Sequence, residues 1–554
     1  MEEIINQKPC VVQKIETPQG FSVSYKEHLL YSKYNPSKNI ITAVENLNLL
    51  PGTIILCISP VLGYGLNELK NKLPENCQIV LCEAEQALYD YYKTEGFKAD
   101  GLIECAPAEL SDLPLKLYEL AKSGKYKRVI RLDMSAGLQF NSDFYNKLFA
   151  ACTDSVMTFW KNRITLTRFG RRYSKNLFEN LHYLADSKPI TDYFNSIDKP
   201  IIVFGAGEST QTFVNELLRR NSTSLRGQQP KQSILTNYYI LCVDTALQPL
   251  LKNGITPDGV FVEEAQSVIV KAFTGTPKDT HIFAGLSSIP NIVHRSGAAN
   301  ISYFFTEYAD GAFFDTLKSK DFMPLANKPF GSVGLTAVYY ALKFRKDNSI
   351  PVFITGLDFS YSAGITHTKG ALAHITRLAS NTRLLPVANY NAAFSYGSDK
   401  IIDKSGKTLY TTVTLKSYAA MFNSFFAGVE NLFDVGESGI KLDIPHKDID
   451  CFVASAPRND EVVLRHCKTE GRSNPFDNGI KDFLATEHSA LEHLRDLLTG
   501  NTELTGEALL EEIKKTAAPR EYLYLHFADG WQFSTNQSFL NRIRTEIDFF
   551  LKYI

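Results

Sequence analysis

The stretch that decides the fold is Ile201-Ile202-Val203-Phe204-Gly205-Ala206-Gly207-Glu208-Ser209-Thr210. Its β-branched and aromatic run predicts a buried strand, and Gly205 and Gly207 allow the backbone to turn sharply and to come close to a bound group. We expect Ser209 or Thr210 to cap the helix that follows. Since the N–H groups and the dipole of a helix N-terminus favour an anion, the stretch predicts a strand that leads into a ligand-binding turn.

An acidic residue follows a second predicted strand, which runs from Tyr239 to Val243. Asp244 and Thr245 come directly after this apolar run. In open α/β sheets, ligands sit outside the carboxyl ends of the strands. The sequence therefore places Asp244 and Thr245 at the same edge of the sheet as the glycine turn.

Strand and helix patterns alternate over residues 196–420. We expect strands near 200–204, 238–243, 259–263, 281–285, 301–306 and 350–355, with helices after most of them. One such helix runs from Ala246 to Leu251 and ends at Asn253-Gly254, which is typical of a helix C-terminus. This alternation predicts a central α/β domain, a Rossmann-like parallel sheet with helices on both faces.

The preceding region has a similar pattern. After a small antiparallel start come a strand at 53–58, the turn Gly63-Tyr64-Gly65 with a helix, and a strand at 79–83. Glu83, at the end of that strand, would meet ribose hydroxyls in an adenosine pocket. We favour the alternative that this N-terminal α/β domain is a scaffold without a ligand, because two glycines in a turn are a motif of low specificity.

Helical patterns dominate the end of the chain. Apolar residues recur at helical spacing near 481–484, 488–498, 506–515 and 540–554. A helix with the same spacing over 168–184 bridges from the N-terminal domain toward the central one. The predicted fold class is α/β, and the predicted domains are an N-terminal Rossmann-like domain at 1–195, a central catalytic domain at 196–420 and a helical C-terminal domain at 421–554.

Bulk composition narrows the classes of function. The chain has 554 residues, with 59 Lys and Arg against 60 Asp and Glu, which removes the positive field that nonspecific nucleic-acid binding requires. The 9 cysteines are scattered without a C-x-x-C pair, so we expect free thiols in a reducing compartment. The start, Met1-Glu2-Glu3-Ile4, lacks the layout of a secretory signal, and no apolar run is long enough to span a bilayer. We expect a cytoplasmic protein with no membrane span.

A second group of polar residues follows the last predicted strand of the central domain. Gly356-Leu357-Asp358 ends that strand, Tyr361 comes next, and His367 lies in a polar loop. Such a set suits transfer to a hydroxyl: His367 removes the acceptor proton, Tyr361 bonds a departing phosphate, and Asp358 orients the loop or a sugar hydroxyl. The alternatives are a structural histidine in a loop and an aspartate that caps a turn.

Several motifs of other enzymes are missing. The sequence has no H-E-x-x-H, no clustered Cys and His, no Gly-x-x-x-x-Gly-Lys-Ser/Thr and no Gly-x-Ser-x-Gly. This argues against a catalytic zinc site, a P-loop ATPase and a nucleophile elbow. Metal-independent transfer is the simplest interpretation, although Asp244, Glu263 and Glu264 leave room for Mg²⁺.

Taken in order, these motifs resemble those of the motility-associated factors, the Maf family, which is also described as similar to an archaeal-type pterin diphosphokinase. The motifs are Phe204-Gly205-Ala206-Gly207-Glu208-Ser209, Val243-Asp244-Thr245-Ala246-Leu247, Gly254-Ile255-Thr256-Pro257-Asp258, Gly331-Ser332-Val333, and Gly356-Leu357-Asp358 with Thr366-His367. The resemblance implies a bacterial cytoplasmic glycosyltransferase with a central domain similar to bacterial sialyltransferases. Its implied reaction moves a nonulosonic acid, pseudaminic or legionaminic in type, from a CMP-activated donor to Ser or Thr of flagellin, and requires no cofactor.

The resemblance also implies roles for residues. The implied donor-binding set is Gly205, Gly207, Ser209, Thr210, Asp244, Thr245, Gly331, Ser332 and Gly356. Within it, the first turn would lie against the donor phosphate or ribose, Asp244 and Thr245 near the nucleotide, and Gly331-Ser332 beside the sugar or cytosine. His367 would face the acceptor.

The chain departs from the family pattern at two places. Glu208 stands where the family turn usually has proline, and its charge would repel a phosphate unless the side chain points away or meets a hydroxyl. A glutamate, Glu263 or Glu264, also stands at the acid that commonly follows the Pro-Asp motif. These departures bear on the identity of the donor more than on the fold.

Two other functions stay open at this point. A pterin diphosphokinase would transfer pyrophosphate from ATP with Mg²⁺, using acids such as Asp244, Glu263, Glu264 and Asp358. A non-catalytic chaperone would hold flagellin through the helical C-terminus.

Overall fold

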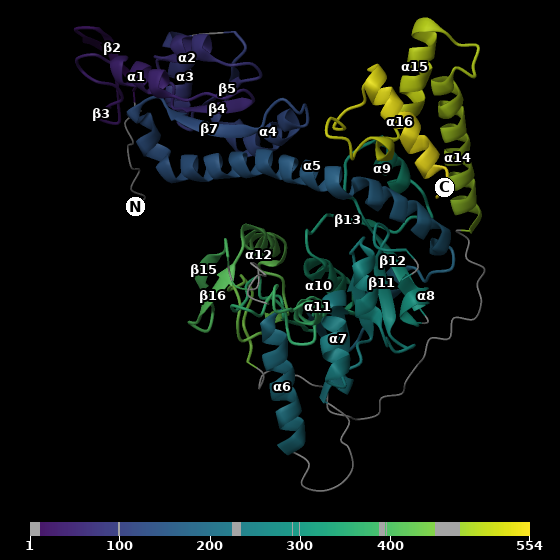
Figure 1. Cartoon of the computed structure of the whole chain (residues 1–554). Helices are drawn as coiled ribbons and strands as arrows, with labels where there is room; N and C mark the ends of the chain where they lie inside the picture. Colours follow the sequence, from purple (N-terminus) through teal and green to yellow (C-terminus); the bar gives the residue numbers. More distant parts are fainter. Residues whose placement is uncertain are drawn as a thin grey trace, which may run out of the picture. The chain divides into compact units, whose positions relative to one another are not determined.

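The computed structural model describes residues 11–97, 100–223, 234–290, 292–298, 300–386, 394, 396–448 and 477–554. The chain forms two compact units, Met1–Arg171 with Tyr524–Ser534, and Arg172–Leu523 with Thr535–Ile554 (Figure 1). The helix α5 (Ser142–Leu184) runs through the boundary at 171/172. The division into domains at 1–195, 196–420 and 421–554 follows other boundaries and stays a prediction.

The second unit is built on an eight-stranded sheet in which all paired strands are parallel. Its order is β13 (Ala326–Asn327), β12 (Asn300–Thr306), β11 (His281–Gly285), β10 (Gly259–Val262), β9 (Tyr239–Val243), β8 (Ile201–Phe204), β14 (Val352–Thr355) and β17 (Leu432–Asp434). The predicted α/β fold and its predicted strands are confirmed. The sequence did not indicate β13 and β17, which contain too few residues to show a strand pattern.

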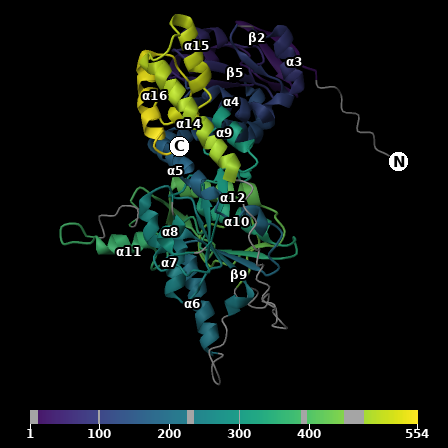
Figure 2. The same ribbon diagram turned by 90° about the vertical axis from the view of Figure 1, so that its right-hand side faces the viewer.

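The order of the strands reverses between β8 and β14. From β8 the chain moves outward through β9, β10, β11 and β12, and it then returns to the other side of β8 to form β14. Helices α6 (Glu208–Thr223) and α7 (Asp244–Lys252) connect the outward path, and α10 (Val333–Phe344) connects the return. Because such crossovers are right-handed, α10 covers the face opposite to α6 and α7. Figure 2 shows α6, α7 and α8 (Ile292–Ser296) grouped together.

The strands of this sheet form because they are apolar on both faces. Every residue of β8, β10, β11 and β14 is buried. A parallel sheet covered on both faces by helices needs such continuous apolar runs. Helix α10 supplies much of the cover, since it packs against β8, β9, β10 and β14.

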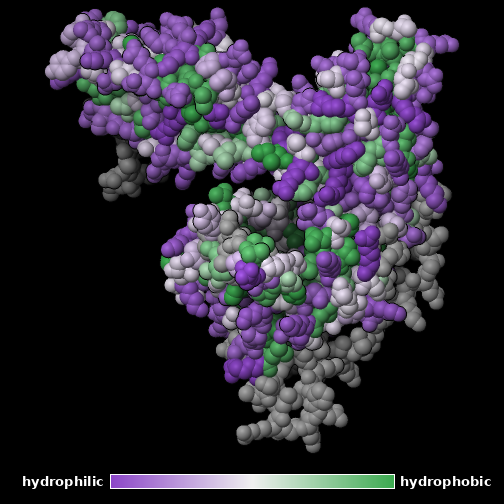
Figure 3. Space-filling model, viewed as in Figure 1, coloured by the Kyte–Doolittle hydropathy of each residue, from purple (hydrophilic) through white to green (hydrophobic). Residues whose placement is uncertain are grey.

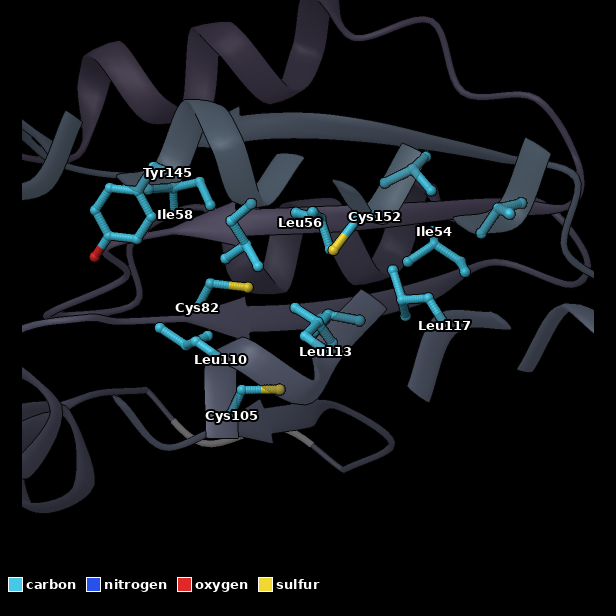
Figure 4. Packing of buried hydrophobic residues seen from close by; sticks show 14 of the residues in the cluster. Ile54, Leu56, Ile58, Cys82, Cys105, Leu110, Leu113, Leu117, Tyr145 and Cys152 are labelled. Carbon is cyan, nitrogen blue, oxygen red and sulfur yellow. The ribbon is translucent and has the colours of Figure 1, made fainter. Parts of the chain in front are cut away.

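The first unit contains a smaller parallel sheet in the order β6 (Ile103–Cys105), β5 (Gln78–Cys82), β4 (Thr53–Ile58) and β7 (Arg128–Asp133). Figure 4 shows how its core packs: Ile54, Leu56 and Ile58 of β4 meet Leu113 and Leu117 of α4 (Leu113–Ala121) and Cys152 of α5. The remaining elements are an antiparallel sheet of β1 (Gln13–Thr17), β2 (Gly20–Tyr25) and β3 (His28–Leu29), and helices α1 (Lys38–Asn46), α2 (Leu66–Lys72) and α3 (Gln86–Glu95).

Helix α5 is longer than the predicted bridging helix, because it begins at Ser142 and not near Arg168. Its apolar positions continue upstream at helical spacing: Leu148, Cys152, Val156 and Phe159 are all buried. The sequence prediction missed the first part of α5, residues 142–167, where charged and polar residues separate the apolar ones.

The C-terminal region is helical, as predicted. It contains α14 (Asp477–Thr499), α15 (Gly506–Ala517) and α16 (Gln537–Phe550), and α14 packs against both of the others. Hydrophobic residues reach the surface beside α15, where Leu504 and Leu510 are exposed (Figure 3). The predicted boundary at 420/421 falls inside α12 (Val413–Phe426), whose buried side chains continue past it at Phe422 and Phe426.

Two further observations concern the chain as a whole. In the described residues, the free cysteines are Cys57, Cys77, Cys82, Cys105, Cys152 and Cys242. Cys10, Cys451 and Cys467 lie outside those residues. No helix in the described part of the chain is both long and apolar enough to cross a bilayer.

Candidate functional site

A cavity of about 320 Å³ lies at the carboxyl edge of the large sheet, where the strand order reverses between β8 and β14. Ligands of doubly wound folds bind at this position, because the loops that leave the two strands diverge to opposite faces and open a crevice. The lining residues are Gly205, Ala206, Gly207, Val243, Thr245, Ser332, Val333, Gly334, Gly356, Leu357, Asp358, Phe359, Ser360, Tyr361, Thr366, His367, Thr412, Leu415 and Tyr418.

The cavity brings together most of the residues that the sequence pointed to. Those that line it are Gly205, Gly207, Thr245, Ser332, Gly356, Asp358, Tyr361 and His367. Four others, Ser209, Thr210, Asp244 and Gly331, do not line it. The glycine turn and the histidine loop thus share one cavity, and the roles of the individual residues stay predictions.

The predicted cap of α6 is wrong. The helix begins at Glu208, so Ser209 and Thr210 lie inside its first turn. The Ser209 N–H donates to Asp358 Oδ2 at 2.8 Å, and its hydroxyl donates to Asp358 Oδ1. The acceptor at this helix N-terminus is therefore the carboxylate of Asp358, which lies 149 residues further along the chain. That carboxylate occupies the anion position that the sequence assigned to a donor phosphate.

Ser209 and Thr210 also tie the turn to the neighbouring strand. Ser209 Oγ accepts from the Gly356 N–H at 2.8 Å, and Thr210 Oγ1 donates to the Gly205 carbonyl at 2.8 Å. Both side chains are buried. Their hydroxyls bond the backbone at Gly205 and Gly356 and are therefore not available to a ligand.

The glycines are required by close packing of backbone. A Cβ on Gly205 would lie 2.3 Å from the Gly356 carbonyl oxygen, and one on Gly207 would lie 2.5 Å from Asp358 Oδ2. Gly356 has φ of +75°, a conformation that other residues rarely adopt. These contacts explain the glycine turn without a ligand, although Gly205, Gly207 and Gly356 also line the cavity.

Asp358 is a buried acid with compensating donors. Burial raises its pKa to about 6, and its hydrogen bonds to Ser209 oppose that rise. A buried ion pair of Lys404 and Asp434 lies nearby, and the Lys404 charge also favours the ionised form of Asp358. The sequence left two roles for Asp358, an orienting group and the cap of the turn that follows it. Its carboxylate instead caps α6, 149 residues earlier in the chain, and Asp358 still lines the cavity.

Asp244 does not line the cavity. Its Oδ1 accepts from the Thr245 N–H at 2.6 Å at the start of α7. Burial, together with the nearby carboxylates of Glu264 and Glu263, raises the pKa of Asp244 to about 7. Thr245, the next residue, lines the cavity in its place.

The glutamates at the two departures from the family pattern also have partners. Glu208 Oε2 accepts from the Ser362 hydroxyl at 2.5 Å, so its side chain meets a hydroxyl and does not line the cavity. Glu263 accepts from the hydroxyls of Thr306 and Thr336, each at 2.8 Å. In the described part of the chain, no three or more His, Cys, Asp or Glu side chains gather as a metal site would require.

His367 and Tyr361 also line the cavity. Burial lowers the pKa of His367, and the charges of Arg377 and His374 lower it further, so the ring is neutral near pH 7. Its Nδ1 lies 3.1 Å from Thr366 Oγ1, which leaves Nε2 as the nitrogen that can meet a ligand. The Tyr361 hydroxyl shares a hydrogen bond with Ser398.

The sequence analysis missed several lining residues. Thr412, Leu415 and Tyr418 come from α12 and its N-cap, where Thr412 Oγ1 accepts from the Leu415 N–H at 3.3 Å. A threonine before an apolar run is a helix-start signal that could have revealed them. Phe359 has φ of +48°, and no sequence signal indicates this left-handed conformation beside the cavity.

Glu83 of the first unit does not offer a ribose site. Its Oε2 accepts from the Ser59 hydroxyl at 2.7 Å, and its Oε1 accepts from the Tyr145 hydroxyl at 3.0 Å and from the Glu85 N–H at 2.9 Å. Both carboxylate oxygens are thus engaged inside the unit. This favours the scaffold alternative for the N-terminal region.

The fold defines a doubly wound α/β protein with a cavity at the reversal of its strand order. Residues 172–364 match a family model described as "6-hydroxymethylpterin diphosphokinase MptE-like". An uncharacterised protein of Treponema pallidum (strain Nichols) is 30% identical over 574 residues, which cover 98% of this chain and 94% of that protein. The chain belongs to the same family as this Treponema pallidum protein. The match to the MptE-like model bears out the resemblance to the Maf family that the ordered motifs predicted.

A solved structure has the same fold over nearly the whole chain. The structure of the MAf glycosyltransferase from Magnetospirillum magneticum AMB-1 has a TM-score of 0.51 to this one, at 12% sequence identity. The similarity covers 99% of this chain and 91% of that chain. At this identity the likeness concerns the fold.

Proposed function

We propose that this protein is a protein O-glycosyltransferase that moves a nonulosonic acid, pseudaminic or legionaminic in type, from a CMP-activated donor to Ser or Thr of flagellin in the cytoplasm. The observation that carries the proposal is the cavity at the β8/β14 reversal, with His367 in its wall. Its volume of about 320 Å³ lies in the range of small-molecule sites. The fold shared with a MAf glycosyltransferase supports the reaction class.

The chemistry of the lining supports a donor without adjacent phosphate charges. Among the described residues that line the cavity, Asp358 is the one charged side chain, and the other polar groups are hydroxyls, His367 and backbone. Donors with a diphosphate are usually held by Mg²⁺ or by several cations. A CMP-nonulosonic acid carries one phosphate and one carboxylate, both joined to the anomeric carbon of the sugar, and it has no second phosphate next to the first. Neutral hydrogen-bond donors suit these two single charges.

The start of α10 gives the donor a suitable place. Ser332 caps this helix, with its Oγ accepting from the Gly334 N–H at 3.3 Å, and Ser332, Val333 and Gly334 all line the cavity. The positive end of the helix dipole thus faces the cavity, where it favours a phosphate or carboxylate. Tyr418 offers an aromatic face on which a cytosine ring can stack.

The reaction divides into two bond changes. The bond between the sugar carbon and the phosphate oxygen breaks with its electron pair on CMP, and the hydroxyl oxygen of the acceptor forms the new bond and loses its proton. In this proposal His367 meets the reacting groups with Nε2, since its Nδ1 lies 3.1 Å from Thr366 Oγ1. Thr245, Ser332 and the turn at Gly205 and Gly207 would hold the donor.

Two measurements test this function. Flagellin from a strain that lacks the protein should be lighter by the mass of the sugar, and an unchanged intact mass would count heavily against the proposal. Calorimetry with the purified protein should show binding of CMP in preference to UDP, because the cavity suits a single phosphate. Equal or better binding of UDP would contradict the donor class.

The match to a pterin diphosphokinase model favours one other enzyme activity. That activity predicts consumption of 6-hydroxymethylpterin that depends on ATP and Mg²⁺. An assay for ATP-dependent loss of the pterin decides between the two, since a glycosyltransferase leaves the pterin unchanged.

The exposed leucines beside α15 give a specific reason to test binding without catalysis. A chaperone that only holds flagellin would restore motility to a deletion strain when it carries His367→Ala. If this variant binds flagellin in a pull-down but restores neither glycan nor motility, the binding-only function is excluded.

A further inference from the structure

A buried arginine organises the loop that carries His367. Arg377 lies on α11 (Leu372–Ala379) and is only 7% exposed. Its Nη1 donates to Thr366 Oγ1 at 3.1 Å, and its Nη2 donates to the Gly364 carbonyl at 2.6 Å. Since Thr366 Oγ1 also lies 3.1 Å from His367 Nδ1, a chain of hydrogen bonds runs from Arg377 through Thr366 to His367.

The direction of this chain follows from the proton inventory of each group. A guanidinium can only donate, so the Thr366 oxygen accepts from Arg377. A hydroxyl has one hydrogen, and in the described part of the protein the acceptor within reach of it is His367 Nδ1. If that hydrogen points to Nδ1, both the Thr366 hydroxyl and His367 Nδ1 have partners, and the ring hydrogen of His367 must sit on Nε2. The opposite arrangement would leave the Thr366 hydrogen without an acceptor.

The charges around the loop keep the ring neutral. No carboxylate in the described residues pairs with Arg377, and a buried cation without a counter-ion strongly disfavours a second positive charge nearby. Arg377 Nη2 also donates to His374 Nδ1 at 3.0 Å, so His374 is an acceptor and neutral in this arrangement. Burial lowers the pKa of both His367 and His374 in the same direction. The one acid of the cavity, Asp358, is held by Ser209.

We propose that Arg377, acting through Thr366, holds His367 as a neutral ring with its hydrogen on Nε2, so that His367 donates a hydrogen bond to an anionic oxygen of the bound ligand and does not remove a proton. This differs from the role of base that the sequence predicted. The anionic ligand rests on the proposed function, whereas the position of the hydrogen does not depend on it. Arg377 and Thr366 are positioning residues in this arrangement.

The transfer reaction balances with this assignment. His367 Nε2–H bonds the phosphate oxygen that gains the electron pair of the broken carbon–oxygen bond. The proton of the acceptor hydroxyl passes to an oxygen of that same departing phosphate, whose second pKa of about 6 makes it a competent acceptor. The polarising charge of Arg377 reaches the ligand through two neutral groups, which strengthens the donor without requiring imidazolium.

The first test reads the hydrogen position directly. In full-length protein labelled with ¹⁵N-histidine, the ring signals of His367 are assigned by their loss in His367→Gln, and those of His374 by their loss in His374→Gln. We expect the chemical shifts of a neutral ring protonated on Nε2 for both residues. A ring of His367 protonated on Nδ1 would overturn the proposal, whatever ligand the protein binds.

Two positioning variants extend this test. Thr366→Val removes the hydroxyl with little change of shape, and Thr366→Ser restores it. We expect the His367 ring of Thr366→Val to populate both neutral tautomers, so that its chemical shifts move toward an average of the two. Thr366→Ser should keep the wild-type shifts. Unchanged shifts in Thr366→Val would show that Thr366 does not set the hydrogen position.

The second test compares replacements of the ring by ligand binding and by transfer. The amide N–H of Gln reaches the position of Nε2, that of Asn reaches the position of Nδ1, and neither accepts a proton as a base does. We expect His367→Gln to stay within about tenfold of the wild type, and His367→Ala and His367→Asn to lose about a hundredfold or more. A loss in His367→Gln as large as that in His367→Ala would restore the role of base. Absence of CMP binding in every protein, with the Nε2 hydrogen still seen by NMR, would count against the proposed function alone.

Discussion

At the scale of single residues, the cavity wall depends on glycines at positions where a larger side chain would not fit. Gly205, Gly207 and Gly356 allow the turn after β8 and the loop after β14 to lie in contact, and Asp358 occupies the space beside Gly207. Ser209 then reaches Asp358 with both its N–H and its hydroxyl. The cavity wall is thus a set of short contacts that leaves little room for change.

Gly207→Ala should therefore destabilise the protein. The new Cβ would meet Asp358 Oδ2 at 2.5 Å and the Gly356 carbonyl oxygen at 2.7 Å, and overpacking of this kind costs about 1–3 kcal/mol. Gly285→Ala is the matched control, because its nearest contact would be an ordinary 3.4 Å to Phe304. Thermal unfolding should show a clear loss for Gly207→Ala and a small effect for Gly285→Ala. Equal Tm values for the two variants would contradict the packing argument.

Asp244→Asn should make stability less dependent on pH. The pKa of Asp244 in the folded protein is about 7, above its ordinary 3.8. Between pH 3.8 and pH 7 the folded protein therefore keeps a proton on Asp244 that the unfolded chain has released. The free energy of unfolding consequently falls as the pH rises through this range. Since Asn cannot ionise, the variant should gain Tm relative to the wild type between about pH 4 and pH 7, at about 1.4 kcal/mol per pKa unit at most.

The measurement is the difference in Tm between variant and wild type at several pH values. Asp279→Asn, at an exposed aspartate, controls for the loss of a surface charge. A difference that stays constant across the window would show that Asp244 is ionised at low pH in the folded protein.

At the scale of elements, the two helices that begin beside the cavity differ in what meets their N-termini. Asp358 occupies the start of α6, whereas Ser332 caps α10 and leaves its first turn in the cavity wall. A ligand anion therefore finds its best helix dipole at α10. The sequence suggested α6 instead, because its glycine turn is the more conspicuous motif.

Ser332→Ala should lower both stability and affinity for CMP. Loss of a serine cap costs about 1 kcal/mol, and the cavity also loses a hydroxyl. Ser332→Thr keeps the capping oxygen and should retain both properties. Asn536→Ala, which removes the cap of α16, is the control: it should lower Tm by a similar amount and leave CMP binding unchanged. Wild-type affinity in Ser332→Ala, measured by calorimetry, would remove Ser332 from the donor site.

At the scale of the whole molecule, the C-terminal helices are part of a core and not a loose appendage. Phe550 of α16 lies 6.0 Å from Phe178 and 5.1 Å from Tyr522 between ring centroids, and Phe313 completes the cluster. The second unit accordingly includes these helices as well as the large sheet. Their apolar faces are used inside the unit, which leaves the leucines beside α15 as the exposed apolar side chains of this region that a partner could meet.

Phe550→Ala should be severely destabilising, by about 3–5 kcal/mol, because the ring is fully buried in this cluster. Phe549→Ala removes a ring of the same size from the neighbouring, partly exposed position and should cost less. The midpoints of urea unfolding measure both. Similar midpoints would mean that the aromatic cluster contributes little to the stability of the unit.

The sequence by itself determined the class of fold and part of the cavity wall. Buried parallel strands must be apolar on both faces, so β8 to β12 and β14 were visible as runs, and residues directly after such strands must meet at one edge of the sheet. That rule placed Gly205, Thr245 and Asp358 together, and it brought the loop that carries His367 to the same edge. Short strands such as β17 carry too few residues for any pattern.

Only the tertiary structure decided which partner each polar side chain has. The Ser209 to Asp358 contact joins residues 149 positions apart, and the Arg377 to Thr366 contact joins two different elements, so no local spacing predicts either. Local periodicity reports burial, because burial repeats along an element. Hydrogen-bond direction and pKa depend on single contacts across the fold, and these arise when the elements pack.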